Sequence, residues 1–165
     1  PEFAAKMLTG IVAGGSGQYP EVHAVTGLRY KGWFGGVGTG FDWYYLNSVP
    51  LYASLSRSFL HKGKHSFMLL GDGGYNFSRN SDPLLDIYAT DVVTRGGLYY
   101  NAGLGWKLGL GKANSGFLLQ LGYSYKQVIQ RVSYNYPCFS PPCLPNTEKN
   151  DYRFKRLSLR IGWDF

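Results

Sequence analysis

The sequence predicts an all-β protein, a closed eight-stranded antiparallel up-and-down β-barrel that forms one domain over residues 1–165. The first observation is the composition, because aromatic residues make up 17% of the chain and 23 of its 165 residues are glycine, which disfavours helices and favours strands. The second is an alternation of apolar and polar residues with a period of two, which indicates half-buried strands. The third is that short connections alternate with longer ones, as they do in up-and-down barrels.

The first four predicted strands cover residues 4–14, 20–30, 33–45 and 48–59. The second alternates weakly, in the stretch EVHAVTGLRY. The third, GWFGGVGTGFDWYY, sets bulky residues against Gly36, Gly38 and Gly40. The fourth, SVPLYASLSRSF, sets leucine and valine against tyrosine and serine. Period-two runs of this length are typical of strands that present one face to an apolar environment.

The last four predicted strands cover residues 65–77, 96–108, 116–134 and 151–165. The stretch FMLLGDGGYNF alternates weakly, whereas GLYYNAGLGWKLGL and GFLLQLGYSY alternate strictly. The chain ends in RLSLRIGWDF, whose alternate residues are apolar and close on Phe165. The longest connections fall at 78–95 and 135–150, on the same predicted end of the barrel.

The volumes of the two faces predict which one points outward. The polar face consists mostly of glycine, serine and asparagine, which fit the narrow interior of an eight-stranded barrel, whereas the bulky face suits lipid. We therefore expect a transmembrane barrel; a soluble barrel with an internal ligand pocket is the alternative. Outward positions are predicted for Leu119, Leu121, Leu157, Leu159 and Ile161, and inward positions for Gln120, Ser158 and Arg160. Aromatic residues near the strand ends form a predicted interfacial girdle: Trp33, Trp43, Phe59, Phe77, Trp106, Tyr125, Trp163 and Phe165.

Several stretches, among them YPEVHAVTGLRY, GVGTGFDWY, NAGLGWKL and RLSLRIGWDF, resemble small outer-membrane β-barrel proteins of the kind common in Bacteroidetes. The resemblance covers about residues 19–165. It implies a Gram-negative outer membrane, periplasmic termini and extracellular long loops, and it offers no catalytic residues and no cofactor. The final strand resembles the assembly signal that the barrel-assembly machinery reads, carried here by Leu157, Leu159, Ile161, Trp163 and Phe165.

Charged residues with inward parity form a predicted lumen network: Arg29, Asp42, Asp72, Lys107, Arg156 and Arg160. Charges inside a narrow barrel must pair or meet water, so the network is expected to plug the lumen; a proton or solute path is the alternative. Their parity and approximate heights along the strands predict two pairs across the lumen, Asp72 with Arg160 and Asp42 with Arg156.

The formal net charge of +7 draws attention to a second set of basic residues. Lys126, Arg131, Arg153 and Lys155 cluster on the last hairpin. We expect them to contact lipopolysaccharide phosphates or an acidic partner protein, because lysine and arginine form strong charge-assisted hydrogen bonds with phosphate; a merely solvated surface is the alternative. Nucleic acid is a poor partner for a chain of this class.

Other motifs predict little chemistry. Cys138 and Cys143, separated by a short loop that contains two prolines, predict a local disulfide in an oxidising compartment, with free thiols as the alternative. No second Cys or His pair stands at ligand spacing, so no metal site is predicted. The stretch GGVGTG lies inside a predicted strand with no helix after it, so its glycines are expected to make room in the barrel and not to bind a nucleotide.

These patterns favour a non-enzymatic outer-membrane barrel that serves as a structural or interaction subunit through loops 78–95 and 135–150, since variable loops on a rigid scaffold carry function. A binder or narrow conduit for small or lipidic molecules is the second hypothesis. A lipid A-modifying enzyme is the third; it would need His23, Asp42 and Ser48 to come together near the outer end of the barrel.

Overall fold

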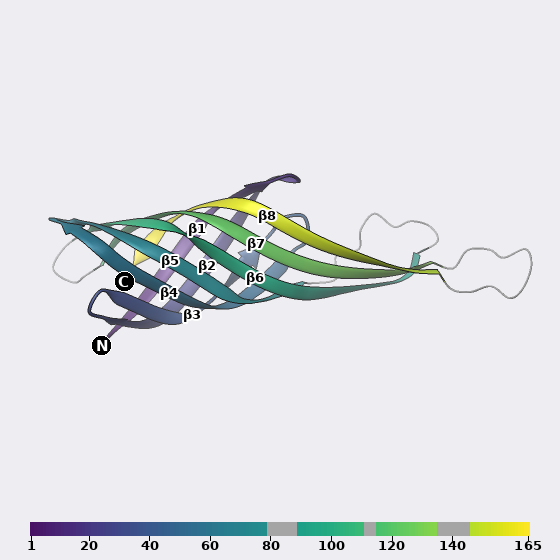
Figure 1. Cartoon of the computed structure of the whole chain (residues 1–165), viewed down its shortest axis with the longest axis horizontal. Coiled ribbons are helices and arrows are strands. Elements are labelled where there is room, and N and C mark those ends of the chain that lie inside the picture. Colours follow the sequence, from purple (N-terminus) through teal and green to yellow (C-terminus); the bar gives the residue numbers. More distant parts are fainter. Residues whose placement is uncertain (79–88, 111–114, 135–145) are drawn as a thin grey trace, which may run out of the picture.

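The computed structural model describes residues 1–78, 89–110, 115–134 and 146–165, and these form one closed barrel of eight antiparallel strands in chain order (Figure 1). Among the described residues, no helical segment has the length and apolar character needed to cross a membrane. The strands are β1 (Glu2–Gly14), β2 (Gly17–Tyr30), β3 (Trp33–Asp42), β4 (Ser48–Lys62), β5 (His65–Ser78), β6 (Ala89–Gly109), β7 (Gly116–Tyr134) and β8 (Asn146–Asp164). The predicted all-β fold, strand number and order are confirmed.

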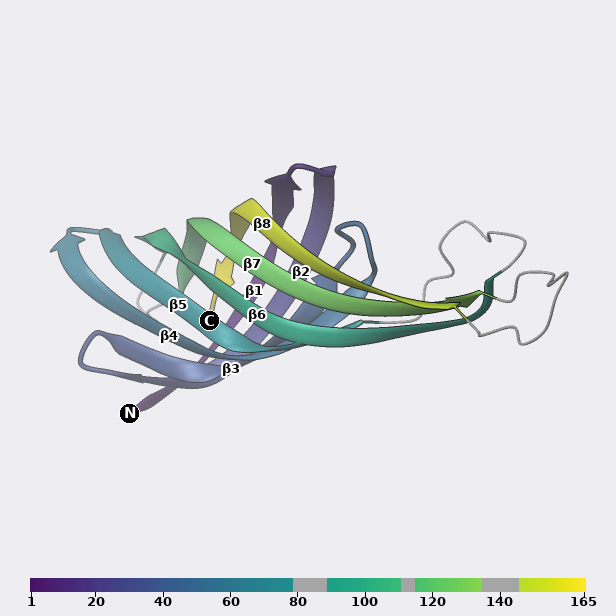
Figure 2. The same cartoon turned by 45° about the vertical axis from the view of Figure 1, so that its right-hand side comes forward.

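Closure is made by β1 and β8, which pair antiparallel from Lys6 opposite Asp164 to Gly14 opposite Arg156. Both termini lie at one end of the barrel, which we call the turn end, together with the β2–β3 and β4–β5 turns (Figure 1). The opposite end is called the loop end. There β6, β7 and β8 project well beyond the other strands, as both views of the barrel show (Figure 2). We call this projecting part the extension.

The predicted strand limits need correction at the loop end. Strand β6 begins at Ala89 and β8 at Asn146, so parts of the predicted loops 78–95 and 135–150 are strand. Residues 89–95 and 146–150 lack a regular alternation of apolar and polar residues, which is why the pattern missed them. Strand β3 ends at Asp42, because the Asp42 carboxylate accepts a hydrogen bond from the Tyr44 amide (2.9 Å) and Tyr45 turns the chain with a φ of 57°.

The two faces of the strands separate as the alternation predicts. Leu121, Leu157, Leu159 and Ile161 are exposed on the outside, whereas Gln120, Ser158 and Arg160 are buried in the lumen. Two apolar clusters also lie inside, among polar side chains and other buried apolar residues such as Leu70 and Val128. One consists of Ala4, Val25, Phe34, Tyr52 and Tyr99, and the other of Leu8, Met68 and Leu118.

Glycines in β3 make room for large side chains in the lumen. A Cβ at Gly38 would stand 2.6 Å from the Tyr52 ring, and one at Gly40 would stand 2.6 Å from the imidazole of His23. The GGVGTG stretch therefore provides space inside the barrel, as its position within a strand predicts.

This packing generates a test at Gly38. We expect Gly38→Ala to lower the free energy of unfolding by about 1–3 kcal/mol, because the added methyl group must displace the Tyr52 ring in an already filled lumen. Gly35→Ala is the matched control on the same strand, since a Cβ there meets nothing within 4 Å. Urea unfolding of the refolded variants measures both, and equal midpoints would contradict the packing argument.

Candidate functional site

Arg160 occupies the centre of the lumen and is 1% exposed. Its Nε donates to Glu21 Oε1 at 2.7 Å, and its Nη2 donates to Glu21 Oε2 at 3.1 Å and to the Tyr99 hydroxyl at 3.0 Å. Its Nη1 lies 3.5 Å from Asp72 Oδ2, which confirms the predicted pair of Asp72 and Arg160. The closer partner is Glu21, so β2, β5, β6 and β8 meet at one guanidinium.

His23 extends this central layer. Its Nε2 lies 3.0 Å from Glu21 Oε2 and its Nδ1 lies 3.0 Å from the Tyr52 hydroxyl, so both ring nitrogens have partners. Neither partner belongs to the Asp42 and Ser48 pair that a lipid A-modifying enzyme would require. The buried Ser48 hydroxyl has no hydrogen-bond partner in the described part of the chain. The structure therefore does not assemble His23, Asp42 and Ser48 into a nucleophile, base and acid.

An outer layer lies between the centre and the loop end. The Arg156 Nη1 donates to Asp42 Oδ2 at 2.6 Å, which confirms the second predicted pair, and its Nη2 donates to Ser124 Oγ at 2.9 Å. Lys126 lies in the same layer, with its ammonium 3.6 Å from Asp42 Oδ2. It also donates to the carbonyl oxygens of Tyr44 at 3.0 Å and Leu46 at 2.7 Å.

The prediction that Lys126 contacts an external partner is therefore wrong. Its ammonium is fully buried in the lumen, because Lys126 shares the inward parity of Ser124 and Gln120 on β7. The other three residues of that predicted surface, Arg131, Arg153 and Lys155, are exposed on the extension of β7 and β8. Arg153 forms an exposed ion pair with Asp151 at 3.1 Å. Their contact with phosphate or a partner protein stays a prediction.

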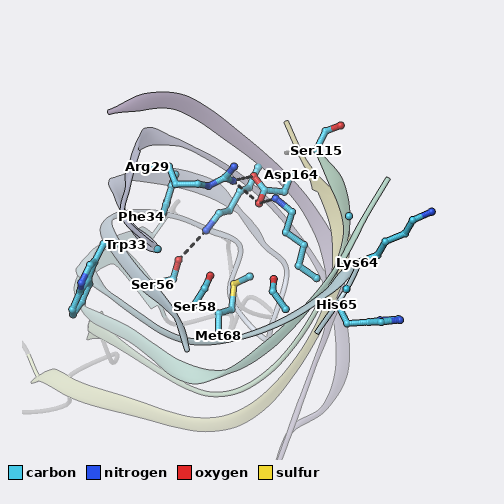
Figure 3. A pocket seen from close by; sticks show the side chains of 16 residues that line it. Arg29, Trp33, Phe34, Ser56, Ser58, Lys64, His65, Met68, Ser115 and Asp164 are labelled. Atoms are coloured by element: carbon cyan, nitrogen blue, oxygen red, sulfur yellow. Dashed lines mark hydrogen bonds and ion pairs between the residues drawn. The ribbon is translucent and has the colours of Figure 1, made fainter. Parts of the chain in front are cut away.

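A third layer of charges lies at the turn end and surrounds a cavity of about 380 Å³. The Asp164 carboxylate forms ion pairs with Arg29 Nη2 at 2.6 Å and with Lys107 Nζ at 2.8 Å. Both predicted lumen cations therefore lie inside, and their partner is an aspartate outside the predicted network. Figure 3 shows Arg29 and Asp164 on one side of the cavity and Ser56, Ser58 and Met68 on the other.

The residues that sequence reasoning missed are Lys6, Glu21 and Asp164 as lumen charges, with Tyr52 and Tyr99 as their hydroxyl partners. A signal existed for two of them. Asp164 shares the parity of Arg160 on β8, and Glu21 shares the parity of Arg29 on β2, so alternation alone places both inward. Lys6 had no such signal because β1 alternates poorly, with apolar residues on both faces.

Within the described residues, no group of three or more His, Cys, Asp or Glu residues is placed to hold a metal ion. Cys138 and Cys143 lie outside the described residues, so their disulfide stays a prediction. No family model matches the sequence, and no curated protein matches it. Three layers of charged side chains occupy the lumen, and the layer at the turn end surrounds a cavity.

The central layer generates a stability test. We expect Arg160→Met to lower the free energy of unfolding by about 3–5 kcal/mol, because it leaves Glu21 as a buried charge without its main partner. The double variant Glu21→Gln with Arg160→Met should recover part of that loss, since it removes both charges.

Arg153→Met is the control, because Arg153 is exposed on the extension and its removal should change the stability by less than about 0.5 kcal/mol. Chemical unfolding of Arg160→Met, of Glu21→Gln alone, of the double variant and of Arg153→Met gives the comparison. A double variant that is as unstable as the sum of its single changes would contradict a direct coupling between Glu21 and Arg160.

Proposed function

We propose that the protein is an integral outer-membrane β-barrel of a Gram-negative bacterium that acts as a structural or interaction subunit, with a lumen sealed by its own side chains. The observation that carries the proposal is the inside-out distribution of residues. Leucine, isoleucine, phenylalanine and tryptophan cover the outside of the strands, while arginine, lysine, aspartate and glutamate are buried in the lumen.

The outward apolar surface supports a lipid environment. Monomeric soluble proteins rarely expose continuous apolar patches of this extent, whereas a transmembrane barrel requires an apolar band on its outer face. Leu51, Leu69, Leu104 and Leu121 are each more than half exposed and come from four neighbouring strands. The soluble-barrel alternative would need these residues inside, so the same observation disfavours it.

Aromatic residues support the proposed placement of the barrel. Trp33, Trp163 and Phe165 are exposed near the turn end, and Trp43 and Phe77 are exposed toward the loop end. Tryptophan and tyrosine prefer the two membrane–water interfaces, which leaves the leucine-rich zone between them for the hydrocarbon core. In outer-membrane barrels the short turns are periplasmic and the longer loops extracellular, so we propose that the extension of β6–β8 lies outside the cell.

The charged lumen supports the sealing role. The interior of an eight-stranded barrel is just wide enough for side chains, and here buried ion pairs cross it at the level of Asp42, of Glu21 and of Asp164. Because the lumen is sealed, we propose that the extension is the part that binds a partner; it carries Arg131 and Arg153 at exposed positions. We propose lipopolysaccharide phosphates or another outer-membrane protein as its partner, and the barrel-assembly machinery as the reader of the final strand.

The interaction role is tested by crosslinking and purification from outer membranes of the native host. We expect a stoichiometric partner that is retained by wild type and lost when Arg131→Glu and Arg153→Glu are combined. Arg57→Glu, an exposed arginine near the turn end, is the matched control and should retain the partner. Loss in all variants, or in none, would contradict recognition by the extension. Stable conductance steps from the purified barrel would favour a conduit instead.

Membrane embedding is tested at Leu159, which is exposed on the outside of β8. We expect Leu159→Arg to reduce the free energy of folding into bilayers by about 2–4 kcal/mol, because the guanidinium lies near the midplane of the hydrocarbon. Leu28→Arg is the control near the turn end, where the cost should fall to about 0–1 kcal/mol. Refolding titrations in lipid vesicles measure both, and equal costs at the two depths would contradict the proposed embedding.

A further inference from the structure

The charges of the central and outer layers balance when the two layers are taken together, whereas the charges of the third layer do not. In the central and outer layers, Arg156, Arg160 and Lys126 face the carboxylates of Glu21, Asp42 and Asp72, with His23 counted as neutral. Among the described residues that line the cavity at the turn end, Lys6, Arg29 and Lys107 face a single carboxylate, that of Asp164. Among the described strands, the excess positive charge of the lumen is therefore concentrated in one place.

Lys6 is the cation that this imbalance leaves without an acidic partner. It is 4% exposed, its ammonium donates to the neutral Ser56 hydroxyl at 3.1 Å, and it lies 3.6 Å from the centre of the Phe34 ring. No described carboxylate forms an ion pair with it. A buried ammonium without a counter-ion is costly, so this position is stabilised when an anion enters.

The other charged groups near the cavity do not restore the balance. Glu2 stands opposite Arg29 in the β1–β2 register, but it is exposed and does not line the cavity. Lys64 and His65 belong to the cavity wall through the β4–β5 turn, and Figure 3 shows both side chains pointing away from the interior. Asp72 lies deeper, where it accepts from Asn101 at 3.0 Å and lies near Arg160.

We propose that this cavity is a binding site for a small phosphate monoester, held by Lys6, Arg29 and Lys107. The doubly charged phosphate group of a monoester matches the excess of two positive charges. The guanidinium of Arg29 has the planar geometry that recognises phosphate. The hydroxyls of Ser56, Ser58 and Ser66 line the wall and supply further donors.

The volume and the apolar lining place the organic part of the ligand. A cavity of about 380 Å³ falls at the small end of ligand pockets and is larger than a single inorganic ion requires. Phe34 and Met68 line it beside the serines, so a short carbon skeleton has apolar contacts next to the phosphate. The site requires only the folded barrel, so it does not rest on the proposed membrane function.

The test uses the full chain folded in detergent micelles and titrated calorimetrically with glycerol 3-phosphate near neutral pH. We expect saturable binding of one ligand per barrel. Dimethyl phosphate, a diester with one charge, should bind at least about tenfold more weakly at the same ionic strength, because it matches only half of the excess charge. The same comparison distinguishes a site for a phosphate monoester from a site for the diester phosphate of a lipid headgroup.

Two variants should change the affinity in opposite directions. Lys6→Met should weaken binding about tenfold, because it removes the unpaired buried cation while keeping the length of the side chain. Asp164→Asn should strengthen binding, because it removes the carboxylate that competes for Arg29 and Lys107. Without ligand, Lys6→Met should unfold no earlier than wild type, since it relieves repulsion in the cavity.

Lys64→Met is the matched control and should leave the affinity within about twofold, because its side chain points away from the cavity. Equal weakening by Lys6→Met and Lys64→Met would show a nonspecific response to surface charge and overturn the site. Absence of saturable binding to wild type, or equal affinity for the monoester and the diester, would overturn it as well. Because no bilayer is used, each of these results is independent of the membrane test at Leu159.

Discussion

The pairing of Arg160 with Glu21 is the interaction on which the interior of this barrel depends. A guanidinium buried at the centre of a narrow lumen is tolerated only when acceptors reach it, and here they come from β2, β5 and β6. Strand β2 lies on a different wall of the barrel from the adjacent strands β5 and β6. The pair therefore sets their relative heights, because a slip of one residue would turn either partner to the outside.

The rest of the lumen accommodates this pair. The Tyr52 hydroxyl contacts His23, which in turn contacts Glu21, and the Tyr52 ring fits because Gly38 has no side chain. Serine and asparagine occupy several other inward positions near the centre, where Ser158 donates to Asn101 at 3.1 Å and Asn101 donates to Asp72. The barrel has a fixed width, so its few large, charged side chains fit inside only because many other inward positions are glycine.

Alternation in the sequence predicts the number of strands, their order and the inward or outward direction of most side chains. It places Arg156 and Arg160 correctly because a strand has a strict period of two. The same rule places Lys126 inward, where it is buried, although it stands beside other basic residues in the sequence. The choice of Glu21 over Asp72 as the closer partner of Arg160 was not predictable, because it depends on how far opposite walls are staggered, which no local pattern encodes.

The unequal lengths of the strands give the chain two kinds of stability. Strand β8 pairs with β1 only from Arg156 to Asp164, and β6 pairs with β5 only from Gly97 on, so beyond these residues β6–β8 form an open three-stranded sheet in the described part of the chain. Hydrogen bonds in the closed part break only when the whole ring opens, whereas an open sheet frays from its margins. The outer part can therefore rearrange to suit a neighbour while the ring beneath it stays intact.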